Sequence, residues 1–197
     1  MPYRHAEATH FWLNEGWTTY IERLLQQFLH SPAARGFQYV IGSTALSEAL
    51  SNYADRPKYQ RLVIDFEPGE DPDDAYSSIP YEKGSNFLLY LGVFNFCSLA
   101  SESHRFSEQT LGGLDVFLPY IRDYVATFQG KSITTWDWKA HLYTYFERHG
   151  GQEKLDALNS VNWDVGSRLY KVPRRLADPY SGVVLRRRAE APRGALV

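Results

Sequence analysis

Residues 10–20 read His10-Phe11-Trp12-Leu13-Asn14-Glu15-Gly16-Trp17-Thr18-Thr19-Tyr20, and this stretch decides how the rest of the chain is interpreted. It places one acidic residue, Glu15, among aromatic side chains at the start of a predicted helix. A carboxylate in such surroundings can be a ligand of zinc, because neighbouring groups orient the oxygens that bind the metal. Glu15 is therefore the first candidate functional residue.

The sequence after Glu15 predicts a helix over about residues 14–29. Its apolar residues recur at helical spacing and predict one buried face: Ile21, Leu24, Leu25, Phe28 and Leu29. Pro32 and Gly36 are expected to end this helix. A second helix is expected to begin later, with Ser43 or Thr44 as its N-cap.

The rest of the chain also predicts helices, after a short extended piece at 61–66 and a loop at 67–80. A third helix is expected to begin near Pro80, because proline suits a first helical turn. A fourth, over about 113–128, has the most regular apolar pattern. Thr134-x-x-Asp137 resembles a capping box that opens a fifth, and a short last helix follows Gly150-Gly151. The sequence thus predicts a mainly α fold.

Composition narrows the class of protein. The chain has 197 residues with 5 Trp, 14 Tyr and 11 Phe, enough apolar material for one domain with a sizeable core. A single cysteine, Cys97, excludes an internal disulfide and fits a reducing compartment. No apolar run approaches membrane-spanning length, and no leader-like apolar segment opens the sequence. We expect a cytoplasmic protein without a membrane partner.

Charge divides the chain into two unlike parts. Residues 165–197 hold eight basic and two acidic residues, a net charge of +6, whereas residues 1–164 carry −8. We therefore expect a domain over 1–164 and a disordered basic tail over 165–197. Arg186-Arg187-Arg188 raises the alternative of nucleic-acid contact, but a short basic run is more often a solvated surface and the acidic domain disfavours phosphate. No nucleic-acid partner is expected.

A second motif, Pro80-Tyr81-Glu82-Lys83-Gly84, joins Asn14-Glu15-Gly16 in suggesting a family. Together the two motifs resemble the leukotriene A(4) hydrolase and zinc aminopeptidase family of gluzincin metallopeptidases. The resemblance covers residues 9–91 and 108–164. It implies the second half of a thermolysin-like catalytic domain, with an unusual insert at about 92–107 and the basic tail beyond 164.

The resemblance also implies roles for four residues. Glu15 matches the third zinc ligand, and Tyr81 matches the tyrosine that stabilises the oxyanion during peptide hydrolysis. Asp73 and Tyr76 match positions near the substrate channel. Taken alone, Glu15 could cap its helix, Tyr81 is one of 14 tyrosines, and Asp73 could belong to a solvated acidic loop.

The family's other two zinc ligands and its general base lie in an H-E-x-x-H helix. Its second histidine precedes the Asn-Glu-Gly glutamate by about eighteen residues, which places both histidines before Met1. His5 and His10 are five apart rather than four, so they do not reproduce the pair, and we expect them to be solvent-exposed. The chain as written is therefore expected to lack a complete zinc site.

Two functions of different class follow. The resemblance implies a zinc-dependent aminopeptidase that removes N-terminal residues from peptides, with hydrolysis of a fatty-acid-derived epoxide as a second implied activity; the chain alone is expected to be inactive. The alternative is a non-catalytic helical fragment or interaction module. Half a catalytic domain leaves apolar helix faces uncovered, so self-association is also expected.

Overall fold

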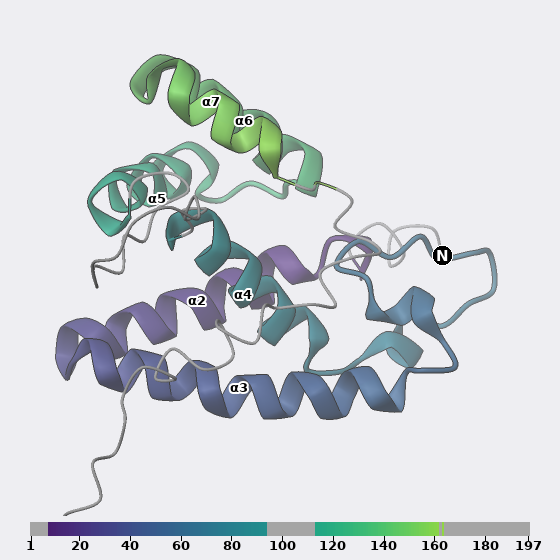
Figure 1. Cartoon of the computed structure of the whole chain (residues 1–197). Coiled ribbons are helices and arrows are strands. Elements are labelled where there is room, and N and C mark those ends of the chain that lie inside the picture. The colour runs from purple at the N-terminus through teal and green to yellow at the C-terminus, as the bar shows by residue number, and fades with distance from the viewer. Residues whose placement is uncertain (1–7, 94–112, 162, 164–197) are drawn as a thin grey trace, which may run out of the picture.

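A computed structural model describes residues 8–93, 113–161 and 163, and within these residues it contains helices and no strands (Figure 1). The mainly α prediction is confirmed for this part of the chain. The elements in order are α2 (Trp12–Leu29), α3 (Pro32–Asn52), the short 3₁₀ turns η1 (Pro57–Gln60) and η2 (Pro72–Ala75), α4 (Ile79–Val93), α5 (Leu114–Phe128), α6 (Thr135–His149) and α7 (Gly151–Ser160).

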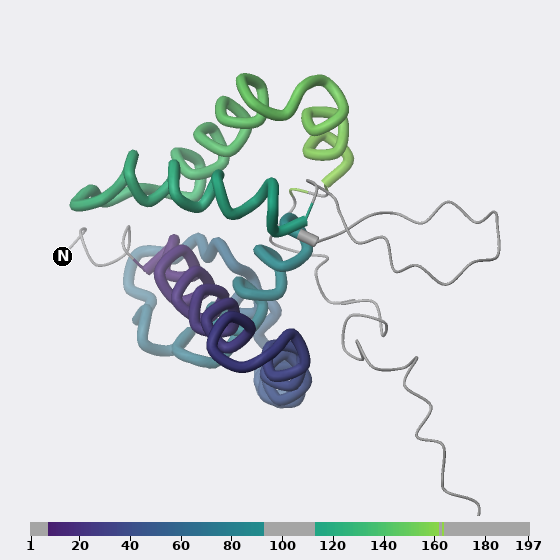
Figure 2. The backbone as a smooth tube through the Cα atoms, turned by 90° about the vertical axis from the view of Figure 1, so that its left-hand side faces the viewer, coloured from purple at the N-terminus to yellow at the C-terminus, as the bar shows by residue number. Residues whose placement is uncertain are grey.

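The helices form two groups that lie one above the other (Figure 2). The hairpin of α2 and α3 packs with α4 in one group, and α5, α6 and α7 make up the other. Trp12, fully buried on α2, reaches the second group, where its ring meets Trp138 of α6 edge-on at 5.3 Å between centroids. One aromatic core thus extends from α2 into the second group.

The first two helices differ in part from prediction. α2 begins and ends close to the expected bounds, but Leu25, Phe28 and Leu29 are 52%, 63% and 72% exposed, so the predicted buried stripe is wrong at its C-terminal end. Leu24 of the predicted stripe is buried, but most residues that α2 buries lie on another face, which includes Trp12, Gly16, Tyr20 and Arg23. Spacing identifies side chains that share a face, and only packing decides whether that face meets a neighbour.

The second helix begins much earlier than Ser43 or Thr44. Pro32 does not merely end α2; it occupies the first turn of α3, where its missing N–H costs nothing. Ser31 is the N-cap, and its hydroxyl accepts a hydrogen bond from the Ala34 amide at 3.1 Å. Gly36 lies inside α3 and does not break it.

The later helices agree with prediction. α4 begins at Ile79, α5 covers Leu114–Phe128, and Gly130 follows α5 with φ of 72°. At the start of α6, the Thr134 hydroxyl accepts from the Asp137 amide, and the Asp137 carboxylate accepts from the Thr134 amide, which completes the predicted capping box. Residues 61–66 form no strand.

The proposed insert and tail lie almost wholly outside the described residues. Gly92, expected to open the insert, instead continues α4, where it packs against the Phe117 ring of α5. Residues 94–112 and 165–197 are not described. Within the described ranges, no helix is long and apolar enough to cross a membrane.

Candidate active site

Two glycines bring the two sequence motifs into direct contact. Gly16 of α2 and Gly84 of α4 face each other so closely that a Cβ built on Gly16 would lie 2.9 Å from the Gly84 Cα. Real Cβ atoms do not approach backbone that closely, so only glycine fits on either side. Asn14-Glu15-Gly16 and Pro80–Gly84 therefore form one helix crossing, although 68 positions separate the two glycines in the sequence.

This crossing places Glu15 beside Tyr81. Burial raises the pKa of Tyr81 to about 12, helped by hydrogen bonding with Tyr76 and by the charge and hydrogen bonding of the Glu15 carboxylate. The Phe11 ring meets the Tyr81 ring edge-on at 6.4 Å between centroids. Glu15, Tyr76 and Tyr81 are thus brought together, and the Tyr81 phenol keeps its proton.

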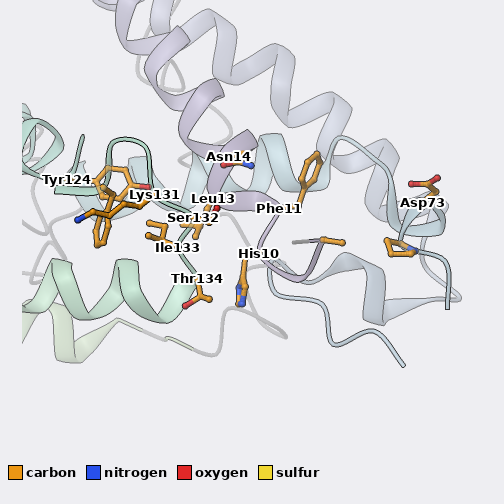
Figure 3. A pocket seen from close by; sticks show the side chains of 13 residues that line it. His10, Phe11, Leu13, Asn14, Asp73, Tyr124, Lys131, Ser132, Ile133 and Thr134 are labelled. Atoms are coloured by element: carbon orange, nitrogen blue, oxygen red, sulfur yellow. The ribbon is translucent and has the colours of Figure 1, made fainter. Parts of the chain in front are cut away.

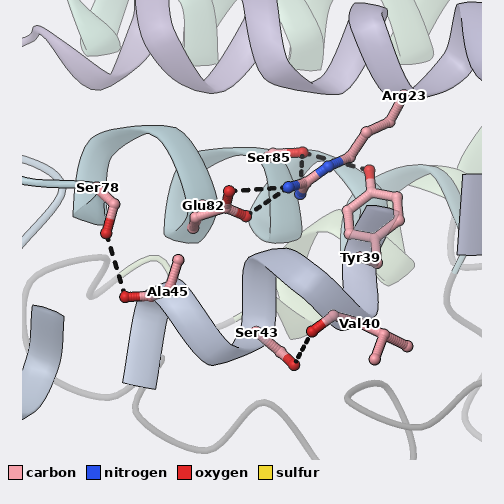
Figure 4. Close-up of polar contacts among 8 residues, drawn as sticks. All are labelled: Arg23, Tyr39, Val40, Ser43, Ala45, Ser78, Glu82 and Ser85. Atoms are coloured by element: carbon pink, nitrogen blue, oxygen red, sulfur yellow. Dashed lines mark hydrogen bonds and ion pairs between the residues drawn. The ribbon is translucent and has the colours of Figure 1, made fainter. Parts of the chain in front are cut away.

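The next residue of the motif, Glu82, has a structural partner. Its carboxylate accepts two hydrogen bonds from Arg23 Nη2 of α2, at 2.7 and 2.8 Å (Figure 4). The Arg23 guanidinium also lies 4.5 Å from the ring centroid of Tyr39 on α3. Gly42 of α3 leaves room for this pair, because a Cβ there would overlap the Glu82 carboxylate. The ion pair ties α2 and α4 together above α3.

Lys83 fixes the other side of α4. It is 2% exposed, and its Nζ donates to the Gln60 carbonyl at 2.7 Å. The Gln60 side chain in turn donates to the carbonyls of Leu50 and Tyr53 at the end of α3. Burial lowers the pKa of Lys83 to about 8. Lys83 thus connects the start of α4 to the segment that follows α3.

Tyr53 anchors the loop that precedes Tyr81. Its phenol lies 3.0 Å from the Asp74 carbonyl oxygen and 3.1 Å from the Tyr76 carbonyl oxygen, as their hydrogen-bond donor. The loop residues Asp73 and Tyr76 are both exposed, Tyr76 by 70%. The anchor therefore holds the backbone of the loop while the side chains of Asp73 and Tyr76 are exposed.

Asp73 and Tyr76 line different hollows. Asp73 belongs to a groove of about 760 Å³ that His10, Phe11 and Asn14 also line (Figure 3). Tyr76 lines a second hollow of about 370 Å³ beside the end of α3. Of the four predicted site residues, Glu15, Tyr76 and Tyr81 come together, while Asp73 faces a groove whose lining residues include neither Glu15 nor Tyr81.

His10 corrects the expectation of solvent-exposed histidines. It is half-buried, and its Nδ1 lies 2.9 Å from Thr135 Oγ1 at the start of α6. His5 lies outside the described residues.

Sequence reasoning missed four positioning side chains: Arg23, Tyr53, Gln60 and Lys83. Their contacts join residues far apart in the chain, so no local spacing identifies the partners. One signal could have found Arg23 and Lys83. Glu82 and Lys83 are adjacent charged residues at the start of a helix predicted to be buried, and each buried charge needs a partner.

The described residues do not complete a metal site. No group of three His, Cys, Asp or Glu side chains that could hold a metal occurs within 8–93, 113–161 and 163. Glu15 would be one carboxylate ligand, and a zinc site needs at least three protein ligands.

Comparison with known proteins identifies the family. Residues 6–97 match the peptidase family M1 domain. Across these residues the sequence is that of the peptidase M1 family, whose members use zinc.

Individual relatives agree with this assignment. Leucine aminopeptidase 2 of Aspergillus niger is 39% identical over 81% of this chain and 23% of its own length. The leukotriene A-4 hydrolase homolog of Botryotinia fuckeliana is 38% identical over 81% of this chain and 22% of its own length. The structure of yeast LTA4 hydrolase in complex with bestatin superposes with a TM-score of 0.68 and 34% identity, over 81% of this chain and 22% of that one. The chain thus spans about a fifth of the length of the relatives it matches.

Proposed function

We propose that this chain is part of the catalytic domain of a zinc-dependent aminopeptidase, equivalent to the second half of a thermolysin-like domain. Glu15 would be one zinc ligand, and Tyr81 would stabilise the oxyanion that forms when the peptide carbonyl is attacked. The substrate class is peptides with a free N-terminus, and a fatty-acid-derived epoxide is a second candidate. The M1 match and the resemblance to leucine aminopeptidase 2 support this proposal.

The observation that carries the proposal is the position of Glu15 beside Tyr81. A metal ligand and an oxyanion donor must face the same reacting carbonyl, so they must be near neighbours. The glycine-to-glycine crossing of α2 and α4 produces that arrangement from two motifs far apart in sequence. A helix-capping role for Glu15 would not require Tyr81 or Gly84.

Tyr81 is suited to donate a hydrogen bond to a developing oxyanion. With a pKa of about 12, its phenol stays protonated through neutral and mildly alkaline pH. Its interaction with Glu15 and Tyr76, and the edge contact with Phe11, orient the hydroxyl before substrate binds. A zinc ion, when bound, would polarise the carbonyl; the residues of this chain would orient it and stabilise its charge.

The groove beside Asp73 is the proposed location of the peptide chain. Phe11 and Leu13 give it apolar walls, and Asp73 and Asn14 supply polar groups. Asp73 would help to position a water or the substrate backbone. Phe11, which lines this groove and meets the Tyr81 ring edge-on, would connect the groove to the reacting centre.

The chain alone is proposed to be inactive, since its described residues provide one zinc ligand. The alternative function, a non-catalytic helical module, also predicts that this chain alone has no activity. Zinc analysis after gel filtration gives a first test. We expect far less than one zinc per chain; one tightly held zinc per chain would contradict the proposal that the chain alone lacks a complete zinc site.

A hybrid enzyme tests the catalytic role of Tyr81. Residues 8–93 would replace the aligned segment of Aspergillus niger leucine aminopeptidase 2, and hydrolysis of a leucine-based fluorogenic substrate would be measured. Tyr81→Phe should lower kcat by about 10²–10³-fold with zinc content unchanged, the usual effect of losing one oxyanion donor. Tyr90→Phe, on the same helix, is the matched control. A Tyr81→Phe hybrid with full activity would contradict the catalytic role of Tyr81.

A further inference from the structure

Three polar side chains join the segment before α2 to the start of α6. His10 Nδ1 lies 2.9 Å from Thr135 Oγ1 and 3.4 Å from the Thr135 backbone nitrogen. The Trp12 indole N–H donates to the same Oγ1 at 3.0 Å. Trp12 is fully buried, Thr135 is 3% exposed and His10 is half-buried.

The Thr135 amide decides which nitrogen of His10 carries the proton. Its hydrogen has a position fixed by the backbone and is directed at Nδ1. A protonated Nδ1 would face that hydrogen, so Nδ1 must be the acceptor and the ring proton must be on Nε2. The Thr135 hydroxyl, which accepts from Trp12, then donates its own hydrogen to Nδ1.

Thr135 occupies the first position of α6, where amides have no partner within the helix. The capping box provides partners for the Thr134 and Asp137 amides, and the Thr135 amide between them bonds to His10. We propose that His10, as the neutral Nε2–H tautomer, is a positioning residue that caps α6 from a distant segment and fixes the start of α2, which carries Glu15, against the second helix group.

Protonation of His10 would break this cap. It would turn the acceptor into a donor facing an N–H, and add a positive charge at the positive end of the α6 dipole. Among the described residues, the charged groups that act on His10 are Asp137 in the first turn of α6 and Asp65 in the segment after η1, and both favour the imidazolium. Burial opposes them more strongly, so the pKa of His10 is lowered below its ordinary value of 6.5.

The sign of the pH effect follows. Between the lowered pKa and about 6.5, the unfolded chain binds the proton and the folded chain does not, so stability is lost as pH falls through this window. Asp137 has its own pKa lowered by bonds from Thr134, so it stays charged there.

Nitrogen-15 NMR of the histidines in the full chain tests the proposal. Long-range proton–nitrogen spectra at pH 7.5 should show His10 with an unprotonated Nδ1 and a protonated Nε2. On titration to pH 5, its midpoint should lie below that of the histidines of the same chain unfolded in urea. A protonated Nδ1 at pH 7.5, or a midpoint at or above the unfolded value, overturns the proposal.

Three variants separate positioning from general packing. Thr135→Val removes the hydroxyl but keeps the amide, so it should raise the His10 midpoint toward the unfolded value while Nδ1 remains unprotonated; Thr135→Ser should leave both unchanged. His10→Asn should lose less stability than the natural chain between pH 7.5 and 5.5. An equal loss of stability in His10→Asn and in the natural chain would contradict the role of His10 as a neutral cap of α6. Since no zinc or substrate is involved, these results do not depend on the proposed peptidase function.

Discussion

At the scale of single residues, Pro80–Gly84 shows how a short motif can divide its duties. Tyr81 interacts with Glu15, Glu82 pairs with Arg23, Lys83 bonds to the Gln60 carbonyl, and Gly84 meets Gly16. Successive residues of a helix point about 100° apart, so four consecutive residues meet four different surroundings. Only Tyr81 is left to face the proposed reacting centre; the others hold α4 in place.

Removing one partner of the Arg23–Glu82 pair should strongly destabilise the fold. The two side chains are 7% and 13% exposed, so Glu82→Gln leaves a buried guanidinium without its counter-charge. We expect a loss of about 3–5 kcal/mol in the free energy of unfolding, measured by urea denaturation. Glu22→Gln, an exposed change on α2, should cost less than about 0.5 kcal/mol. A loss for Glu82→Gln no larger than this control would show that the pair is not maintained in solution.

At the scale of elements, the crossing of α2 and α4 is the feature that forms the candidate site. Its distance is set by two glycines rather than by interdigitating side chains. Any side chain at this point would separate the helices, and Glu15 would move away from Tyr81.

Gly84→Ala tests this crossing. The added methyl would lie 2.9 Å from the Gly16 Cα, and backbone cannot rotate aside as a side chain does. We expect a destabilisation of about 1–3 kcal/mol in urea, although alanine favours helix. Gly16→Ala should act in the same direction, and an unchanged or raised unfolding midpoint in both would rule out the close approach.

The helix bounds show how much of the fold could be predicted from the sequence. The bounds of α2, α5 and α6 follow from apolar spacing and from local caps such as Thr134 with Asp137, because these depend on residues three or four apart. The predicted start of α3 is wrong. Pro32 alone indicates a helix end, but Ser31 caps the new helix and Pro32 therefore lies in its first turn. The roles of Glu15 and Tyr81 are implied by the family resemblance, and their contact is seen only in the structure. Arg23 and Tyr53 were missed, because their partners are distant in sequence.

At the scale of the whole molecule, buried phenols join the two helix groups. Burial raises the pKa of Tyr20 and of Tyr124 to about 12, and raises that of Tyr120 well above 10. Trp17 stacks on Tyr124 of α5 at 4.9 Å, so α2 and α5 share this aromatic cluster.

Alkaline pH should therefore unfold the chain. The folded state keeps protons that unfolded tyrosines lose near pH 10, so stability is lost as pH rises from about 10 toward 12. Lys83 acts in the opposite direction between about pH 8 and 10.5, because its folded pKa is lowered. Urea midpoints should thus fall between pH 10.5 and 11.5, and fall less for Tyr124→Phe. An equal fall in that variant would exclude Tyr124 as a cause.

The exposed apolar surface of α2 and α3 predicts that the chain self-associates. Leu25, Phe28 and Leu29 on α2 and Phe37 and Ile41 on α3 are each at least half exposed, and the two helices run side by side (Figure 1). We expect concentration-dependent dimers in sedimentation velocity. Phe28→Glu with Phe37→Glu should weaken them, and Val125→Glu on α5 should not. A monomer at every concentration would contradict this prediction.

The zinc content of the leucine aminopeptidase 2 hybrid carrying residues 8–93 tests the central claim most directly. If Glu15 is a zinc ligand, the hybrid should hold one zinc per chain, and Glu15→Gln should remove most of it under dialysis while Glu22→Gln, two turns further along α2, keeps it. A Glu15→Gln hybrid that retains its zinc as fully as the Glu22→Gln control would contradict the assignment of this chain to a zinc centre.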